Sequence, residues 1–123
     1  MKAVSRSLPK AHVLVVDDEA PILEWLRELL SRAGFEVSAA GDGAEALERF
    51  QVQKTDIVVT DILMEGMDGY TLCREIKQRS PHEFIPVIFM TALPDIEKGL
   101  DCGADEYLIK PVRSEEVIAR IHS

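Results

Sequence analysis

The stretch "HVLVVDDEAP", from His12 to Pro21, leads from a buried segment straight into three acids. Val13–Val16 is an apolar run without polar alternation, which is typical of a strand covered on both faces. Asp17, Asp18 and Glu19 follow it directly. Carboxylates this close repel one another when all are ionised. The end of this first strand therefore needs something that offsets the repulsion.

The same kind of apolar run recurs along the chain and alternates with amphipathic stretches. Strands are predicted at 12–16, 35–40, 56–61, 85–91 and 105–111, and helices at 20–34, 42–53, 68–80, 95–103 and 114–123. Five strands that alternate with five helices favour an α/β fold, a doubly wound five-stranded parallel sheet with helices on both faces. In the first helix, Trp25 and the leucines are predicted to face the core.

The overall composition bounds what the domain binds. The chain has 123 residues, enough for one domain, and 14 basic against 22 acidic residues give a formal net charge of −8. This charge argues against direct binding of nucleic acid or of an anionic membrane, and no apolar run reaches the roughly 18 residues of a membrane span. Residues 1–10 lack the apolar core of a secretion signal and are predicted to be a flexible lead-in to a domain at 11–123. Cys73 and Cys102 show no metal-ligand spacing, which favours free thiols in the cytoplasm.

Polar side chains stand at the carboxyl ends of the predicted strands, where parallel α/β sheets bind their ligands. Asp17 and Asp18 end the first strand, Asp61 ends the third, Thr91 the fourth and Lys110 the fifth. In a parallel sheet, these three carboxylates, one hydroxyl and one ammonium group meet at one edge. Three neighbouring carboxylates cannot all stay ionised unaided, and oxygen ligands select a hard cation such as Mg²⁺.

An ammonium group and a hydroxyl beside such a metal site favour phosphate binding. Lys110 would act as a point charge for a phosphate oxygen, and Thr91 would donate a hydrogen bond to the same group. A carboxylate, Mg²⁺ and a phosphate clamp together point to phosphoryl transfer onto the carboxylate itself. Each residue alone has ordinary explanations, such as a turn or a helix cap, but the combination in this order is much more specific.

Several pieces of the sequence together resemble the receiver domain of two-component response regulators, the CheY-like family. They are "VLVVDDE", "DGAEAL", "DIVVTDILM" with "MDGY", "FMTA" and "GADEYLIKP", and the resemblance covers about residues 11 to 123. It implies a flavodoxin-like sheet with strand order 2-1-3-4-5 and a role as phosphorelay receiver in signal transduction. It implies a sensor histidine kinase or a phosphotransfer protein as partner, a downstream output domain, and no enzymatic activity beyond the domain's own phosphorylation and dephosphorylation. A phosphorylation-dependent dimer is left open.

The resemblance also implies a role for each strand-end residue. Asp61 is the expected phospho-acceptor, which takes the phosphoryl group from a phosphohistidine. Asp17 and Asp18, together with Asp61 and the backbone carbonyl of Leu63, are the expected ligands of Mg²⁺.

Thr91 and Lys110 are expected to bind the phosphoryl oxygens. Tyr107 resembles an aromatic switch that moves inward when Thr91 is drawn to the phosphate. The Lys110–Pro111 bond is similar to one that is cis in the family.

Two leucines are expected to modulate dephosphorylation. Leu63 lies two residues after Asp61 and Leu93 lies two after Thr91, and in the family polar groups at these positions go with faster self-dephosphorylation. Because leucine cannot hydrogen-bond to the hydrolytic water, the sequence predicts a long-lived phosphorylated state.

The chain departs from the family pattern in three places. Glu65 stands where the family usually has a proline. Lys110 comes only 19 positions after Thr91, about three fewer than usual, so roughly one turn is missing before or within the fourth helix. The last helix ends early, which leaves open a truncated helix and a native protein that continues into an output domain. These departures affect the expected mode of output and not the expected phosphorylation chemistry.

Other interpretations stay open beside this one. A degenerate receiver would only bind proteins, although the intact acceptor and metal set argues against it. A haloacid-dehalogenase-like phosphatase would need a second Asp two residues after its nucleophile, where this chain has Leu63. The dinucleotide pattern G-x-G-x-x-A at Gly41–Ala46 follows the second strand and not the first, so a turn and a helix start are preferred. The scattered residues His12, His82 and His122 favour surface or capping roles over metal ligation.

Overall fold

The computed structural model describes residues 10–92 and 95–122 and confirms the predicted alternation of strands and helices. The strands are β1 (His12–Val16), β2 (Glu36–Ala40), β3 (Ile57–Asp61), β4 (Val87–Thr91) and β5 (Glu106–Ile109), and the helices are α1 (Ala20–Arg32), α2 (Gly43–Val52), α3 (Gly69–Arg79), α4 (Ile96–Cys102) and α5 (Ser114–His122). The strands pair in parallel in the order β2-β1-β3-β4-β5, which is the predicted flavodoxin-like order. The expected lead-in, residues 1–10, lies outside the described ranges except for Lys10.

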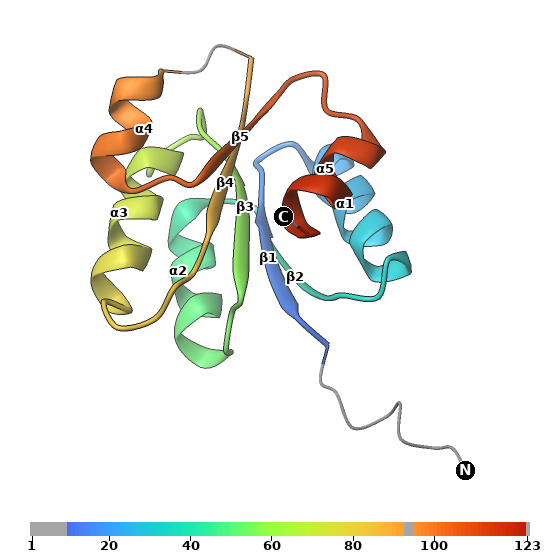
Figure 1. The fold of residues 1–123 in the computed structure, drawn as a ribbon, viewed down its shortest axis with the longest axis horizontal. Helices are drawn as coiled ribbons and strands as arrows, with labels where there is room; N and C mark the ends of the chain where they lie inside the picture. The colour runs from blue at the N-terminus through green and yellow to red at the C-terminus, as the bar shows by residue number, and fades with distance from the viewer. Residues whose placement is uncertain (1–9, 93–94, 123) are drawn as a thin grey trace.

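Helices cover both faces of the sheet, with α1 and α5 on one side and α2, α3 and α4 on the other (Figure 1). Successive side chains of β1 point to opposite faces. Val13 and Val15 lie in the core cluster that contains Leu26 of α1, whereas Leu14 and Val16 lie in the cluster formed with α2 and α3. Because both faces are covered, the apolar run needs no polar alternation. Within the described ranges, no helix has the length and apolar character needed to cross a membrane.

The strand register aligns the carboxyl ends of the strands. Val16 of β1 is paired with Thr60 of β3, so the residues after them, Asp17 and Asp61, stand at the same level of the sheet. β5 ends two residues earlier than predicted, and Lys110 therefore directly follows the strand. The shift leaves Lys110 at the same edge as the acids.

The segment with the dinucleotide-like pattern is a helix start, as the sequence interpretation preferred. Asp42 is the N-cap of α2, and its carboxylate accepts the backbone N–H of Glu45 at 2.8 Å. Gly43 lies against Met67, so that a Cβ at Gly43 would come within 2.8 Å of the Met67 side chain. This glycine therefore makes room for a side chain of the loop after β3 and not for a pyrophosphate.

Trp25 is not a core residue, so the prediction made for it is wrong. It is 38 % exposed, whereas Leu26 and Leu30 of the same helix are fully buried. One residue advances a helix by about 100°, which places Trp25 at the edge of the apolar stripe that contains Leu26. There it lines an apolar groove together with Ile22 and Pro111.

His12 is buried, although the sequence favoured a surface or capping role. Its Nδ1 lies 2.6 Å from the carbonyl oxygen of Lys54, and its Nε2 lies 2.7 Å from the hydroxyl of Ser38. Both ring nitrogens thus have polar partners, which permits burial of the ring. His82 and His122 are exposed, in agreement with the prediction.

Candidate functional site

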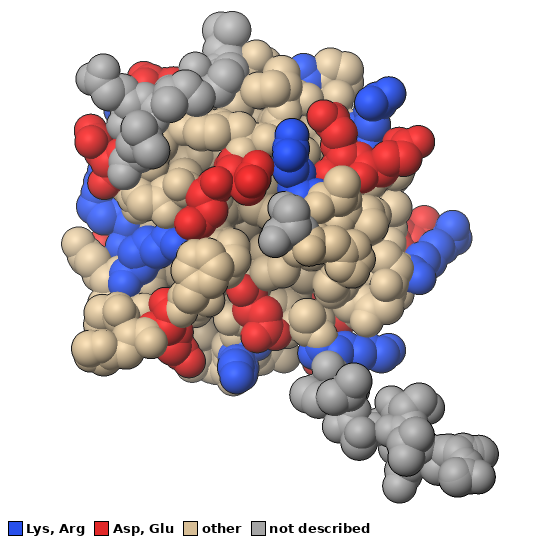
Figure 2. All heavy atoms as spheres, in the orientation of Figure 1, with Lys and Arg blue, Asp and Glu red and all other residues tan. Residues whose placement is uncertain are grey.

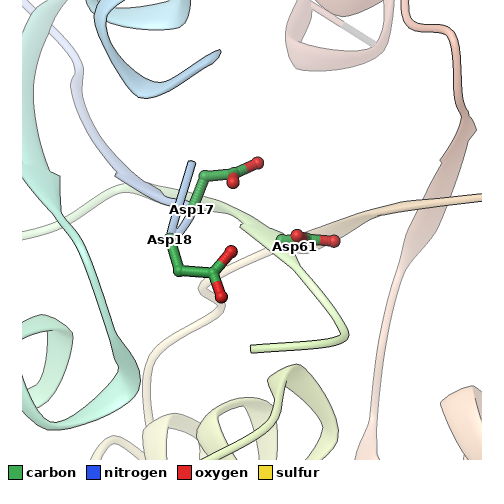
Figure 3. Close-up of side chains that lie close together, drawn as sticks. All are labelled: Asp17, Asp18 and Asp61. Carbon is green, nitrogen blue, oxygen red and sulfur yellow. The ribbon is translucent and has the colours of Figure 1, made fainter. Parts of the chain in front are cut away.

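Three carboxylates come together at the carboxyl end of the sheet. Asp17 and Asp18 directly follow β1, and Asp61 is the last residue of β3. One oxygen from each lies within 4.8 Å of the other two, and Figure 3 shows the three side chains next to one another at the two strand ends. Asp17 and Asp61 are buried, while Asp18 is exposed. The acids that the sequence predicted to meet therefore do lie together.

Asp17 keeps one carboxylate oxygen without a hydrogen bond. Its Oδ1 accepts the backbone N–H of Glu19 at 2.8 Å. Its Oδ2 is buried and has no hydrogen-bond partner in the part of the chain that the structure describes, and Lys110 Nζ lies 4.0 Å from it. A buried polar atom without a hydrogen bond is costly. A cation bound between the acids would satisfy this oxygen.

The environment of Asp17 raises its pKa from 3.8 to about 6. Burial is the largest cause, and the Asp61 carboxylate adds to it, whereas the N–H of Glu19 and the Lys110 ammonium act in the opposite direction. The folded protein therefore holds a proton at Asp17 more strongly than the unfolded chain does. The resulting stabilisation is fully present below pH 3.8 and is lost as the pH rises through about 6.

Asp17→Asn is expected to stabilise the metal-free protein at neutral pH. The difference between a pKa of 3.8 and one of about 6 corresponds to roughly 3 kcal/mol at most, and asparagine keeps an oxygen for the N–H of Glu19. Urea unfolding with a chelator present, at pH values from about 4.5 to about 7.5, measures the effect. The free energy of unfolding of the variant should exceed that of the wild type most at neutral pH and least at the lowest pH.

Asp101→Asn is the matched control, because Asp101 is an exposed carboxylate of α4 outside the cluster. The difference in the free energy of unfolding between Asp101→Asn and the wild type should not change over the same pH range. If Asp17→Asn proves less stable than the wild type at neutral pH without metal, burial and crowding of the carboxylates are not the main cost at this site.

The carboxylate of Asp61 contacts a backbone N–H group and the ammonium group of Lys110. Its Oδ1 accepts the N–H of Ile62 at 2.8 Å and lies 3.2 Å from Lys110 Nζ. Gly69, the first residue of α3, packs so closely that a Cβ there would lie 2.5 Å from the Asp61 carbonyl oxygen. Sequence reasoning missed this contact, although a glycine directly after the helix cap Asp68 was an available signal.

The cleft beside Asp61 has a volume of about 410 Å³ and is lined by Asp18, Glu19, Asp61, Leu63, Thr91, Ala92 and Lys110. The predicted acceptor therefore shares one cavity with both predicted phosphoryl-binding residues. The backbone N–H of Lys110 donates to the carbonyl oxygen of Thr91 at 2.8 Å, which joins the ends of β4 and β5 at the cleft. The Lys110–Pro111 bond is cis, as the resemblance implied.

Of the two leucines predicted to modulate dephosphorylation, Leu63 is among the described residues. Leu63 lines the cleft and is 81 % exposed, so it stands at the solvent-facing rim. Leu93 lies outside the described residues. α4 has seven residues and is the shortest of the helices in the described ranges, which agrees with the short spacing between Thr91 and Lys110.

Tyr107, the predicted switch residue, lies on β5 and is not among the residues that line the cleft. Its ring meets Phe89 edge-on, with the ring centroids 5.7 Å apart. Its hydroxyl donates to the carbonyl oxygen of Asp95 at 3.0 Å. Phe89 and Thr91 are two residues apart on β4, so this strand connects Tyr107 to the cleft.

The arrangement as a whole fits a hard cation and a phosphoryl group. Three carboxylates are grouped beside one ammonium, and carboxylate oxygens are the ligands that Mg²⁺ prefers. Lys110 Nζ is close enough to Asp61 to contact a group bonded to that carboxylate.

Comparison with known proteins gives a family for this arrangement. A family model described as the response regulator receiver domain matches residues 13–122. The chain is 44 % identical over 117 residues to the probable transcriptional regulator ycf27 of Cyanophora paradoxa, with 93 % of this chain and 48 % of the relative covered. It is 41 % identical over 114 residues to the sensory transduction protein RegX3 of Mycolicibacterium smegmatis, with 90 % and 49 % covered. The chain thus spans about half the length of these relatives.

Solved structures are similar over nearly the whole chain. The chemotaxis protein CheY4 of Vibrio cholerae superimposes with a TM-score of 0.88 at 31 % identity, covering 93 % of this chain and 98 % of that one. A response regulator receiver domain protein from Clostridium thermocellum gives a TM-score of 0.82 at 36 % identity, with 91 % of each chain covered. The carboxylate cluster and the cleft lie within the residues that the family model matches.

Proposed function

The chain belongs to the response regulator receiver domains, and from this premise we propose that Asp61 accepts the phosphoryl group of a phosphorelay in a reaction that needs Mg²⁺. The proposed donor is the phosphohistidine of a sensor histidine kinase or of a phosphotransfer protein. The domain would catalyse only this transfer onto itself and the later hydrolysis.

The observation that carries this proposal is the contact between Asp61 and Lys110 inside the carboxylate cluster. Oδ1 of Asp61 is engaged by the N–H of Ile62 and by Lys110, which favours Oδ2 as the atom that attacks phosphorus. As the new O–P bond forms, the P–N bond to the histidine breaks, and its electron pair stays on the histidine nitrogen. Lys110 and Thr91 would hold the phosphoryl oxygens, where charge develops during transfer.

Mg²⁺, when bound, would neutralise the crowded carboxylates and stabilise charge on the phosphoryl group. The proposed side-chain ligands are Asp17, Asp18 and Asp61, and the backbone carbonyl of Leu63 is a further proposed ligand. The buried Oδ2 of Asp17 supports this assignment, because no described residue donates a hydrogen bond to it.

A small phosphodonor such as acetyl phosphate tests the proposed function. With Mg²⁺ present, intact-mass spectrometry should find one added phosphoryl group per chain. With a chelator in place of Mg²⁺, the chain should stay unmodified over the same time. A receiver that only binds proteins would stay unmodified under both conditions, and that result would refute the proposal.

Asp18→Asn is expected to weaken Mg²⁺ binding without unfolding the protein, because Asp18 is an exposed member of the cluster. The loss should reach at least about tenfold, the lower end of what perturbing even an outer-shell partner costs. The melting temperature as a function of Mg²⁺ concentration measures it, since a ligand stabilises the folded state by mass action. Glu115→Gln, an exposed acid of α5, is the control. An unchanged Mg²⁺ dependence in Asp18→Asn would remove this residue from the ligand set.

Leu63→Asn combined with Leu93→Glu is expected to shorten the lifetime of the phosphorylated state. Polar groups at these positions can orient the hydrolytic water. A rise of roughly tenfold in the rate of dephosphorylation requires an activation barrier lower by only about 1.4 kcal/mol. Loss of the phosphoryl group after removal of the donor gives the rate. Leu63→Met keeps an apolar side chain at the rim and should keep the wild-type lifetime. Equal lifetimes in all three proteins would show that the leucines do not shield the site.

We propose that the phosphorylated domain controls a transcriptional output in the full-length protein, because the relative from Cyanophora paradoxa carries the description of a transcriptional regulator. The receiver itself is not proposed to contact DNA. Its formal net charge is −8, and acidic and basic side chains are interspersed on the face drawn in Figure 2. We also propose that the protein is cytoplasmic and that phosphorylation leads to a dimer.

A further inference from the structure

Helix α4 contains a glycine at its centre. Gly99 is the fourth of its seven residues, and glycine is the poorest helix former after proline. The position is buried, and a Cβ there would overlap the hydroxyl oxygen of Tyr107 and come within 2.7 Å of Tyr107 Cζ. A side chain at position 99 and Tyr107 in its present place therefore exclude each other.

The Tyr107 hydroxyl binds to the first turn of the same helix. It donates to the carbonyl oxygen of Asp95 at 3.0 Å, and that oxygen also accepts the N–H of Gly99 at 3.0 Å. Asp95 in addition caps α4, because its Oδ1 accepts the N–H of Lys98 at 3.1 Å. Tyr107 is thus attached to the beginning of α4, the end of the helix that is nearer in sequence to Thr91.

The ring of Tyr107 extends this attachment to the sheet. It contacts Phe89 of β4, and Phe89 contacts Tyr70 of α3 with ring centroids 5.3 Å apart. Tyr107 also packs against the core cluster on the face of the sheet covered by α2, α3 and α4. One side chain therefore joins β4, β5 and the first turn of α4.

We propose that Gly99 is a positioning residue of the output switch. Because Gly99 lacks a side chain, the side chain of Tyr107 can pack between β4 and α4. This packing couples the beginning of α4 to the phosphorylation site. This inference rests on the proposed function, because it takes Thr91 and Tyr107 as the residues that respond to the phosphoryl group. It adds the residue of α4 that receives Tyr107, and it makes the response depend on the size of residue 99.

A thermal cycle, that is, a double-mutant cycle of melting temperatures, tests without any phosphorylation whether Tyr107 packs against Gly99. The four proteins are the wild type, Gly99→Ala, Tyr107→Ala and the double variant. With Tyr107 present, alanine at position 99 should lower the melting temperature in spite of its better helix propensity, because it displaces the tyrosine. With Tyr107→Ala, the same substitution should raise the melting temperature, as glycine to alanine does in an unobstructed helix.

Asp101→Ala, at an exposed position of the same helix, is the matched control and should act alike in both backgrounds. A Gly99→Ala variant that fails to fold while the double variant folds would support the proposal. The same shift of melting temperature from Gly99→Ala in both backgrounds would overturn it.

The switch itself is followed by fluorine NMR after labelling with 3-fluorotyrosine, since the chain has two tyrosines. Tyr107→Phe identifies the Tyr107 resonance. Acetyl phosphate and Mg²⁺ should shift this resonance in the wild type. In Gly99→Ala it should lie at the position of a solvent-exposed tyrosine and stay there, although Asp61 still gains its phosphoryl group. A purely structural glycine would leave the wild-type response intact in the variant, and that result would overturn the positioning role.

The two levels of the proposal fail in different ways. If the wild type takes up no phosphoryl group, the proposed function is wrong. The thermal cycle then still decides whether Gly99 makes room for Tyr107. If both proteins are phosphorylated and show the same Tyr107 resonances, the positioning role of Gly99 is wrong while the proposed function stands.

Discussion

Asp61→Asn is expected to abolish phosphorylation altogether. An amide cannot form the acyl phosphate, and Asp61 is the carboxylate of the cluster that lies 3.2 Å from Lys110. Asparagine keeps an oxygen for the N–H of Ile62, so the end of β3 should stay in place. Intact-mass spectrometry with acetyl phosphate and Mg²⁺ should find no added group at a time when the wild type is fully modified.

The matched control for this loss is Asp101→Asn, which changes an exposed carboxylate of α4. This variant should gain one phosphoryl group at the wild-type rate. Undiminished incorporation in Asp61→Asn would place the acceptor elsewhere. A folded Asp61→Asn protein, shown by a cooperative unfolding transition no lower than that of the wild type, ties its loss of phosphorylation to the chemistry of the carboxylate.

Lys110→Ala is expected to slow phosphorylation by about 100-fold or more, since removal of one preorganised donor to developing charge typically costs about 10²–10³ in rate. The ammonium stands at the cleft, 3.2 Å from Asp61 and 4.0 Å from Asp17. The same substitution should tighten Mg²⁺ binding, because it removes a fixed positive charge that repels the metal. A slower reaction together with a tighter metal site cannot be explained by unfolding.

The rate of phosphoryl incorporation at saturating Mg²⁺ and the melting temperature at varied Mg²⁺ measure the two effects separately. Lys54→Ala is the control, because Lys54 is exposed and precedes β3, at the other end of the sheet from the cleft. It should change neither quantity. A Lys110→Ala protein that is phosphorylated at the wild-type rate would remove Lys110 from the phosphoryl site.

The fold and the meeting of the acids could be predicted because several local signals agree. The apolar runs without alternation indicated strands buried on both faces, and β1 is indeed covered on both faces. Once the sheet is parallel, the residues that follow the strands must share one edge, which is why Asp17 and Asp61 were expected together. This inference needs only the order of the elements and no knowledge of side-chain packing.

The features that the sequence did not predict depend on contacts between distant segments. Trp25 carries the same apolar character as its neighbours, and only the packing of α1 decides that it stands at the edge of the buried stripe. The burial of His12 depends on polar partners from β2 and from the segment before β3. Gly99 has a local cost in its own helix, and its reason becomes visible only when Tyr107 is placed against it.

The most direct test of the central claim is to locate the phosphoryl group on the wild-type protein. Reduction with borohydride converts an aspartyl phosphate to homoserine, and tandem mass spectrometry of peptides then finds the marked residue. After reaction with acetyl phosphate, we expect the mark at Asp61 alone when Mg²⁺ is present, and no mark when a chelator replaces the metal. A mark at any other residue, or equal marking of Asp61 without Mg²⁺, would contradict the account.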